Sequence, residues 1–105
     1  MNCVLPIESD DESVNVLGTR HTALDFRERV SRQLEICQTI QVDFRGVFVT
    51  QSFVDELFGP LILRMGPVLL DRLIFSGCGD DTLAIINLVF ASRLEDFEAQ
   101  NRLPS

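Results

Sequence analysis

The stretch "QVDFRGVFVTQSFVDELF", residues 41–58, decides the fold because two periodicities meet within it. Apolar and polar side chains alternate through residues 42–45, which is the pattern of a half-buried strand. After a glycine, the apolar positions take the three- and four-residue spacing of an amphipathic helix. The turn between these elements contains Thr50, Gln51 and Ser52, whose side chains can cap a helix or take part in chemistry. Three roles are therefore open for this turn: a cap, a phosphate-accepting switch or a catalytic turn.

The segments on either side continue the alternation of strands and helices. Strands are expected at residues 2–7, 14–17, 39–44 and 72–76, and helices at residues 19–37, 52–65 and 82–97. The order β-β-α-β-α-β-α favours a small α/β domain with a mostly parallel sheet of about four strands and helices mainly on one face. A chain of 105 residues is one domain by its length. Within it, residues 1–17 are expected to form a β-hairpin with an acidic loop, and residues 98–105 a frayed tail.

The central strand and the helix after it contain the residues on which this prediction depends most. Phe44 is expected to point inward from the central strand. Ser52 is expected to cap the following helix, because Ser52-x-x-Asp55 is similar to a capping box. Pro60 removes a hydrogen bond within that helix. This predicts either a kink near Gly59-Pro60 or two short helices, with Pro60 at the start of the second.

The last helix is unusually apolar. The sequence Gly66-Pro67 is expected to end the helix before it, and Asp80 or Asp81 is expected to cap the last helix itself. Because apolar residues occupy more than one side of the last helix, it is either sandwiched within the protein or offers a surface to a partner. One hypothesis is therefore that the chain assembles as a homo-oligomer through this helix.

Composition excludes several classes of function. The formal net charge is −7, and all nine basic residues are arginine. An acidic chain is a poor ligand for nucleic acid or for an anionic membrane surface, because both require basic patches. The charge serves solubility, or it forms an acidic face on an inhibitory or decoy protein that binds a basic partner. No apolar run is long enough to cross a bilayer, and the first residues turn acidic at once, so we expect a soluble cytoplasmic protein.

The cysteines and the single histidine indicate neither a metal site nor an enzyme. Cys3, Cys37 and Cys78 are odd in number and far apart, and with His21 they match no zinc-site spacing. We therefore expect small buried hydrophobes in a reducing cytoplasm, with no metal and no cofactor. A catalytic dyad of His21 with Cys37 or Cys78 has no motif in its favour.

Three charged residues near the turn are candidates for a site. Asp55 and Glu56 are consecutive, and adjacent helical residues point about 100° apart, so the two carboxylates do not face each other. Both are better explained as complements to the positive end of the helix dipole. Arg20, at the start of the first helix, is either an anion-binding residue or a solvated arginine.

The stretch "VDFRGVFVTQSFVDELFGPLI" resembles the STAS domain, the fold of anti-sigma-factor antagonists. It is most similar to the STAS-like family of unknown function, whose core has the pattern hDF-x-G-V-x-x-h-[ST]-x-SF-h-[DE]-E-L. The similarity covers residues 40–66, and the flanking segments agree with the family in pattern. The resemblance implies a STAS-like α/β fold and a non-enzymatic regulatory role through protein–protein interaction.

The resemblance also implies where that interaction occurs. In the antagonists, the strand-to-helix turn has the sequence Asp-Ser-Ser-Gly, and a serine in it is phosphorylated by a partner kinase that is also the anti-sigma factor. Gln51, Ser52, Phe53 and Val54 align with this tetrad, so one serine is kept at Ser52, while the aspartate, the second serine and the glycine are replaced. The implied partner is a histidine-kinase-like ATPase or an anti-sigma-type regulator. The implied surface consists of Thr50, Gln51, Ser52, Phe53, Asp55 and Glu56.

Overall fold

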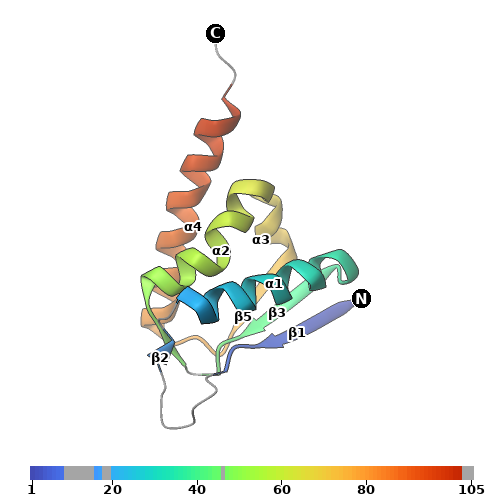
Figure 1. Cartoon of the computed structure of the whole chain (residues 1–105), viewed down its shortest axis with the longest axis vertical. Coiled ribbons are helices and arrows are strands. Elements are labelled where there is room, and N and C mark those ends of the chain that lie inside the picture. Colours follow the sequence, from blue (N-terminus) through green and yellow to red (C-terminus); the bar gives the residue numbers. More distant parts are fainter. Residues whose placement is uncertain (9–15, 18–19, 46, 103–105) are drawn as a thin grey trace.

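The β-branched run around Val42 forms the central strand of a three-stranded parallel sheet, as its composition predicts. The computed structural model describes residues 1–8, 16–17, 20–45 and 47–102. In Figure 1, strand β3 (Thr39–Asp43) lies between β1 (Asn2–Pro6) and β5 (Leu73–Ser76), and the strand order is β1-β3-β5. The fold is the expected small α/β domain, with a central sheet one strand smaller than expected.

The two faces of this sheet differ in burial. Strand β3 buries Ile40 and Val42, and Phe44, just after the strand, is fully buried on the same side. Val4 and Ile74 lie in one row with Gln41 on the opposite face, and both are more than half exposed. The inward position of Phe44 is therefore confirmed, and the described helices cover the buried face of the sheet, as predicted.

Four helices are described. They are α1 (Arg20–Ile36), α2 (Gln51–Met65), α3 (Val68–Arg72) and α4 (Asp80–Asn101). Helix α1 buries a stripe formed by Ala23, Phe26 and Val30 at three- and four-residue spacing. Helix α2 lies between α1 and α4 and packs on both, and α4 extends beyond the rest of the molecule (Figure 1). The short α3 was not predicted, because five residues are too few to show a periodicity.

The expected N-terminal hairpin is wrong. Strand β1 pairs with β3 in parallel, and β2 (Val16–Leu17) pairs in parallel with β4 (Phe48–Val49) in a second, two-stranded sheet. The prediction assumed that β1 and β2 pair because they are consecutive in sequence. Each instead pairs with a strand that follows helix α1 in the sequence. The acidic loop, residues 9–15, lies outside the described residues.

Helix α2 runs without interruption through Pro60, so the alternative of two short helices is wrong. Pro60 is exposed, and the helix continues beyond it to Met65. The helix ends at Gly66, as expected, with a φ of 66° that favours glycine. A side chain at this position would also meet the ring of Phe97, 2.5 Å from an ideal Cβ.

Two expectations for helix α4 are also wrong. Its N-cap is Gly79, which has no side chain to donate or accept, and Asp80 and Asp81 lie in the first turn instead. There they complement the positive end of the helix dipole. The helix continues through Asn101, whose side chain donates a hydrogen bond to the Phe97 carbonyl, so residues 98–101 are not frayed. Residues 103–105 lie outside the described part of the chain.

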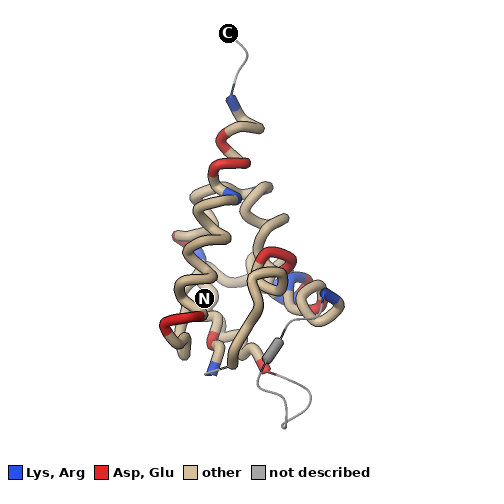
Figure 2. The backbone as a smooth tube through the Cα atoms, turned by 90° about the vertical axis from the view of Figure 1, so that its left-hand side faces the viewer, with Lys and Arg blue, Asp and Glu red and all other residues tan. Residues whose placement is uncertain are grey.

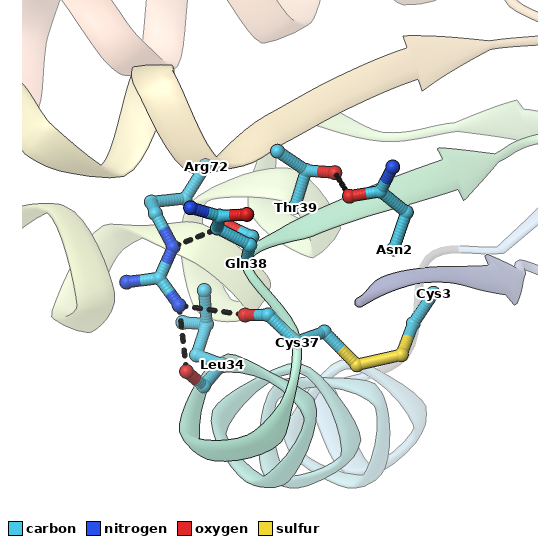
Figure 3. Close-up of a disulfide and its surroundings, with 7 residues drawn as sticks. All are labelled: Asn2, Cys3, Leu34, Cys37, Gln38, Thr39 and Arg72. Atoms are coloured by element: carbon cyan, nitrogen blue, oxygen red, sulfur yellow. Dashed lines mark hydrogen bonds between the residues drawn. A yellow bond between two sulfur atoms is a disulfide. The ribbon is translucent and has the colours of Figure 1, made fainter.

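The expectation of three unbonded cysteines is wrong as well. Cys3 on β1 and Cys37 after α1 form a disulfide, with Cα atoms 5.9 Å apart (Figure 3). Sequence spacing cannot show that the start of β1 lies beside the end of α1. Cys78 is a free, partly buried thiol. Among the described residues, no group of three or more His, Cys, Asp or Glu could hold a metal ion, and no described helix is long and apolar enough to span a membrane.

Candidate functional site at the start of helix α2

The N-cap of α2 is Thr50 and not Ser52. Thr50 has extended backbone angles (φ −89°, ψ 160°), and its Oγ1 accepts a hydrogen bond of 3.1 Å from the Phe53 amide. This contact satisfies one of the amides that a helix start leaves without an intrahelical partner. The prediction of a cap within the turn was correct, but it was placed two residues too far along the chain.

Because Thr50 is the cap, the Ser52 hydroxyl is not needed for that role. Gln51 and Ser52 are both exposed, and the Ser52 hydroxyl makes no hydrogen bond to any residue that the structure describes. Ser52 lies in the first turn of α2, where unpaired amides and the helix dipole favour negative charge. The serine is therefore accessible and has no structural duty as a cap.

Phe53 belongs to the core and not to an exposed surface. Its side chain is fully buried and packs edge-on against Phe26 of α1, with ring centroids 6.3 Å apart. Val54, the next residue, is fully buried as well. Phe53 therefore fixes the turn to the core. The prediction that Phe53 contacts a partner is wrong, because its side chain is not accessible.

Phe48 is an exposed residue at this turn that was not among the predicted site residues. This residue lies on β4, immediately before the turn, and its side chain is 54 % exposed, whereas the neighbouring Val49 is buried. Large exposed aromatic side chains beside an exposed polar turn are typical of protein-binding surfaces. The alternation of Val47, Phe48 and Val49 was the available signal, because a strand that buries Val49 must turn Phe48 outward.

Asp55 joins helix α2 to helix α4. Its two carboxylate oxygens accept hydrogen bonds of 2.6 and 2.7 Å from Nε and Nη2 of Arg93. The hydrogen bond from Arg93 holds the pKa of Asp55 below its ordinary value of 3.8. Asp55 was expected to complement the helix dipole, but it lies beyond the first turn of α2. Its charge is instead paired with Arg93. Gly59, one turn along, leaves room for it, since an ideal Cβ there would lie 3.1 Å from Asp55 Oδ1.

Glu56 joins helix α2 to helix α1. One carboxylate oxygen lies 3.3 Å from Nε of Arg20, and the other lies 3.9 Å from Nη1 of Arg27. Arg27 also donates a hydrogen bond of 2.9 Å to the Glu56 carbonyl. The Arg20 side chain is 77 % exposed and forms an ion pair with Glu56. Ser52 and Glu56 are four residues apart on the helix and share one face, so Arg20 lies on the Ser52 side of α2.

A small pocket lies beside the ion pair of Asp55 and Arg93. The pocket beside the Asp55–Arg93 pair has a volume of about 150 Å³, and its lining contains no serine, cysteine or histidine. The lining residues are Asp55, Glu56, Gly59, Pro60, Leu63 and Arg93. Burial, and then the nearby Asp43 carboxylate, raise the pKa of Cys78, which opposes formation of a reactive thiolate.

The dyad of His21 with Cys37 is not present. His21 lies at the start of α1, and Cys37 follows the end of the same helix, sixteen residues later. At 1.5 Å per residue the two are roughly 24 Å apart. Cys37 is also consumed by its disulfide with Cys3.

Acidic side chains do not gather on one face of the described residues. Figure 2 shows them at several separate places along the backbone. Many are paired with arginine, as in the contacts Asp25–Arg29, Glu28–Arg32, Glu8–Arg45, Asp55–Arg93 and Glu56–Arg20.

Fold and site together define a small α/β domain with a one-sided parallel sheet and an exposed serine at a strand-to-helix turn. Residues 22–83, more than half of the chain and including this turn, match the family model of the STAS-like domain of unknown function. The chain belongs to this family. No curated protein and no solved structure matches it.

Proposed function

We propose that this chain is a non-enzymatic regulatory domain that binds another protein through the turn between β4 and α2. The observation that supports the proposal is the exposed Ser52 hydroxyl, which is free because Thr50 caps the helix. Phe48 adds exposed apolar area at the same turn, and Gln51 adds an exposed amide. A partner surface that covers this turn would bury one aromatic ring among polar contacts, which is the usual composition of a binding site.

A phosphoryl group on Ser52 would act as the switch. Its charge would lie one helical turn before Glu56, so the two anions would repel each other on the same face of α2. Arg20, now paired with Glu56 at 3.3 Å, is the cation best placed to turn toward the new charge. Phosphorylation would thus add charge to the docking surface and rearrange one ion pair beside it.

Substitution of Ser52 tests this proposal. Ser52→Glu is expected to weaken capture of the protein's partner from native extract about tenfold or more. Ser52→Ala should leave both capture and stability nearly unchanged, because Ser52 is not the cap. Thr50→Ala should instead cost about 1 kcal/mol in the free energy of unfolding. Equal capture by wild type and Ser52→Glu would reject the switch.

The matched control is Ser92→Glu, which makes the same change at an exposed serine on α4. It should leave capture unchanged, so that a loss specific to Ser52 is separated from the effect of one more negative charge. The intact mass of protein purified from its own cells should show a fraction that carries one phosphoryl group.

We propose a partner from the class of histidine-kinase-like ATPases or anti-sigma-type regulators. The support is the family resemblance of the strand-to-helix turn, together with the serine retained at Ser52. Such kinases use ATP, which places the interaction in the cytoplasm. In a reducing cytoplasm, the Cys3–Cys37 disulfide would be expected to form only transiently, because disulfides there are usually catalytic or redox-sensing.

A second candidate function is self-association through helix α4. Leu83 and Leu88 are 41 % and 54 % exposed, and no charged residue occurs from residue 82 to residue 92. Two copies of a chain with a charge of −7 would approach most easily through a face without charges. The proposed partner of this uncharged stretch of α4 is therefore a second copy of the same chain.

Sedimentation equilibrium at several concentrations tests this candidate. The wild type should show a concentration-dependent dimer, and Leu88→Glu should weaken the association about tenfold or more, because it places charge in the interface. Leu70→Glu, at an exposed leucine on α3, is the matched control and should leave the dimer intact. A wild-type chain that is monomeric at every concentration would contradict it.

A further inference from the structure

The disulfide joins two segments, one of which has many more other contacts than the other. Cys37 follows α1 and is fixed from the other side by Arg72, whose guanidinium donates hydrogen bonds to the carbonyls of Leu34, Cys37 and Gln38 (Figure 3). The distances are 2.6 Å to Leu34 and 2.8 Å to Cys37. Cys37 therefore keeps its position whether or not the disulfide is present.

Cys3 lies on a strand that has much less support at its beginning. Strand β1 is an edge strand, paired only with β3 among the described strands. Leu5 and Ile7 are buried in the core and hold the second half of β1, whereas Met1 and Val4 are 79 % and 56 % exposed. In the first half of the strand, Cys3 is the side chain that packs against the core.

Apart from the backbone pairing of β1 with β3, the other contacts at the start of β1 are weak. The Gln38 amide donates to the Met1 carbonyl at 2.7 Å. The exposed Thr39 hydroxyl donates to the Asn2 side chain (Figure 3). Exposed hydrogen bonds contribute little, because water replaces them readily. The disulfide is thus the principal side-chain anchor of residues 1–4.

We propose that Cys3 and Cys37 form a reversible thiol–disulfide site that fixes the first half of β1 when oxidised and releases it when reduced. The reductant is a dithiol of low molecular weight or the active-site dithiol of a reducing protein. The site lies at the opposite end of β1 and α1 from the Ser52 turn and does not depend on the proposed docking function (Figure 1). The α1–β3 turn keeps Cys37 in place, so the disulfide can form again when an oxidant returns.

The exchange has a defined direction of attack. Cys37 is 2 % exposed and Cys3 is partly exposed, so a thiolate of the dithiol attacks the Cys3 sulfur. The Cys3–Cys37 bond breaks, a mixed disulfide forms on Cys3, and Cys37 leaves as a thiolate. The second thiolate of the dithiol then attacks the dithiol sulfur that is bonded to Cys3, and Cys3 is released as a thiolate. The dithiol is oxidised by two electrons to a disulfide, and its two protons end on Cys3 and Cys37.

Hydrogen exchange of the full chain with and without dithiothreitol tests the proposal. Reduction is expected to raise amide exchange in residues 2–5 about tenfold or more, while the amides of α2 and α4 remain protected from exchange at 25 °C. It is also expected to lower the thermal midpoint by about 10 °C, because the disulfide closes a long loop. Removal of dithiothreitol and addition of oxidised glutathione should restore the original exchange.

Two variants serve as controls. The double variant Cys3→Ser/Cys37→Ser should show the fast exchange of residues 2–5 with or without dithiothreitol. Cys78→Ser removes the free cysteine, which the disulfide does not use, and should respond to dithiothreitol as the wild type does. Unchanged exchange in residues 2–5 on reduction would overturn the proposal. Unfolding of the whole chain on reduction would also overturn it, because the disulfide would then be a structural staple of the entire domain.

Discussion

Asp55 and Arg93 show how much one pair of side chains can organise. Their two hydrogen bonds of 2.6 and 2.7 Å connect α2 to α4, and Gly59 provides the space in which the guanidinium lies. Each side chain is about one-third exposed, so solvent screens part of the attraction. The pair is therefore expected to contribute only modestly to total stability.

Replacement of Arg93 by methionine should change how stability depends on pH. The folded-state pKa of Asp55 is depressed, so its contribution is present above the ordinary value of 3.8 and is lost as pH falls through the folded value. Arg93→Met should therefore lower the free energy of unfolding on the order of 1 kcal/mol at pH 7. The difference from wild type should shrink below about pH 4. Urea titrations at pH 7 and pH 3 measure it.

Arg64→Met is the matched control for this experiment. Arg64 is exposed and makes no ion pair with a described residue, so its loss should shift stability by at most about 0.5 kcal/mol at either pH. A difference between wild type and Arg93→Met that is equally large at pH 3 and pH 7 would mean that Arg93 acts through packing of its aliphatic stem and not through Asp55.

At the scale of elements, the register of β3 controls which side chains enter the core. Ile40 and Val42 face the helices, Gln41 faces outward, and Phe44 continues the inward set. Phe44 lies 6.4 Å from the Phe75 ring, between centroids, and Phe75 in turn contacts Phe58 and Phe90 in an aromatic cluster. A shift of one residue would exchange the two faces of the strand.

Aspartate substitutions on the two faces of β3 should therefore have opposite outcomes. Phe44→Asp is expected to unfold the domain, because it buries an unpaired carboxylate and removes a ring from the core, a loss of about 4 kcal/mol or more. Gln41→Asp changes a position on the open face and should leave a folded protein by circular dichroism. A folded Phe44→Asp variant would show that the register is wrong.

At the scale of the whole molecule, charge and shape determine the response to salt. The chain has a net charge of −7 and spans 54 × 29 × 24 Å. In about 10 mM salt the screening length of about 30 Å exceeds the two shorter dimensions, so most like charges repel across the molecule. In about 150 mM salt the screening length falls to about 8 Å, and only close ion pairs remain strong.

The thermal midpoint should accordingly rise by a few degrees when NaCl is increased from about 10 mM to about 150 mM at pH 7. Differential scanning calorimetry measures this shift. Long-range repulsion weakens with salt more than the short Asp55–Arg93 contact does. A midpoint that falls over this range would mean that the surface ion pairs outweigh the repulsion.

Parts of the candidate site were predictable because they depend on local chemistry. The strand-to-helix turn, the presence of a cap within it and the inward side of β3 follow from residues that are neighbours in sequence. The choice between Thr50 and Ser52 as the cap did not follow, because both hydroxyls suit the role and only the backbone angles at residue 50 decide it. The burial of Phe53 was also unpredictable, since it depends on Phe26 of another helix.

The sequence by itself determined the order of the main elements, the one-sided sheet with β3 at its centre, and the family to which the chain belongs. These properties come from periodicity, β-branched runs and turn residues, all of which act over a few neighbouring positions. Only the tertiary structure decided that β1 pairs with β3 and β2 with β4, that Cys3 bonds Cys37, and that Arg93 and Arg20 find their carboxylates on α2. Each of these contacts joins residues more than thirty positions apart, where the packing of helices, not local preference, determines which side chains meet.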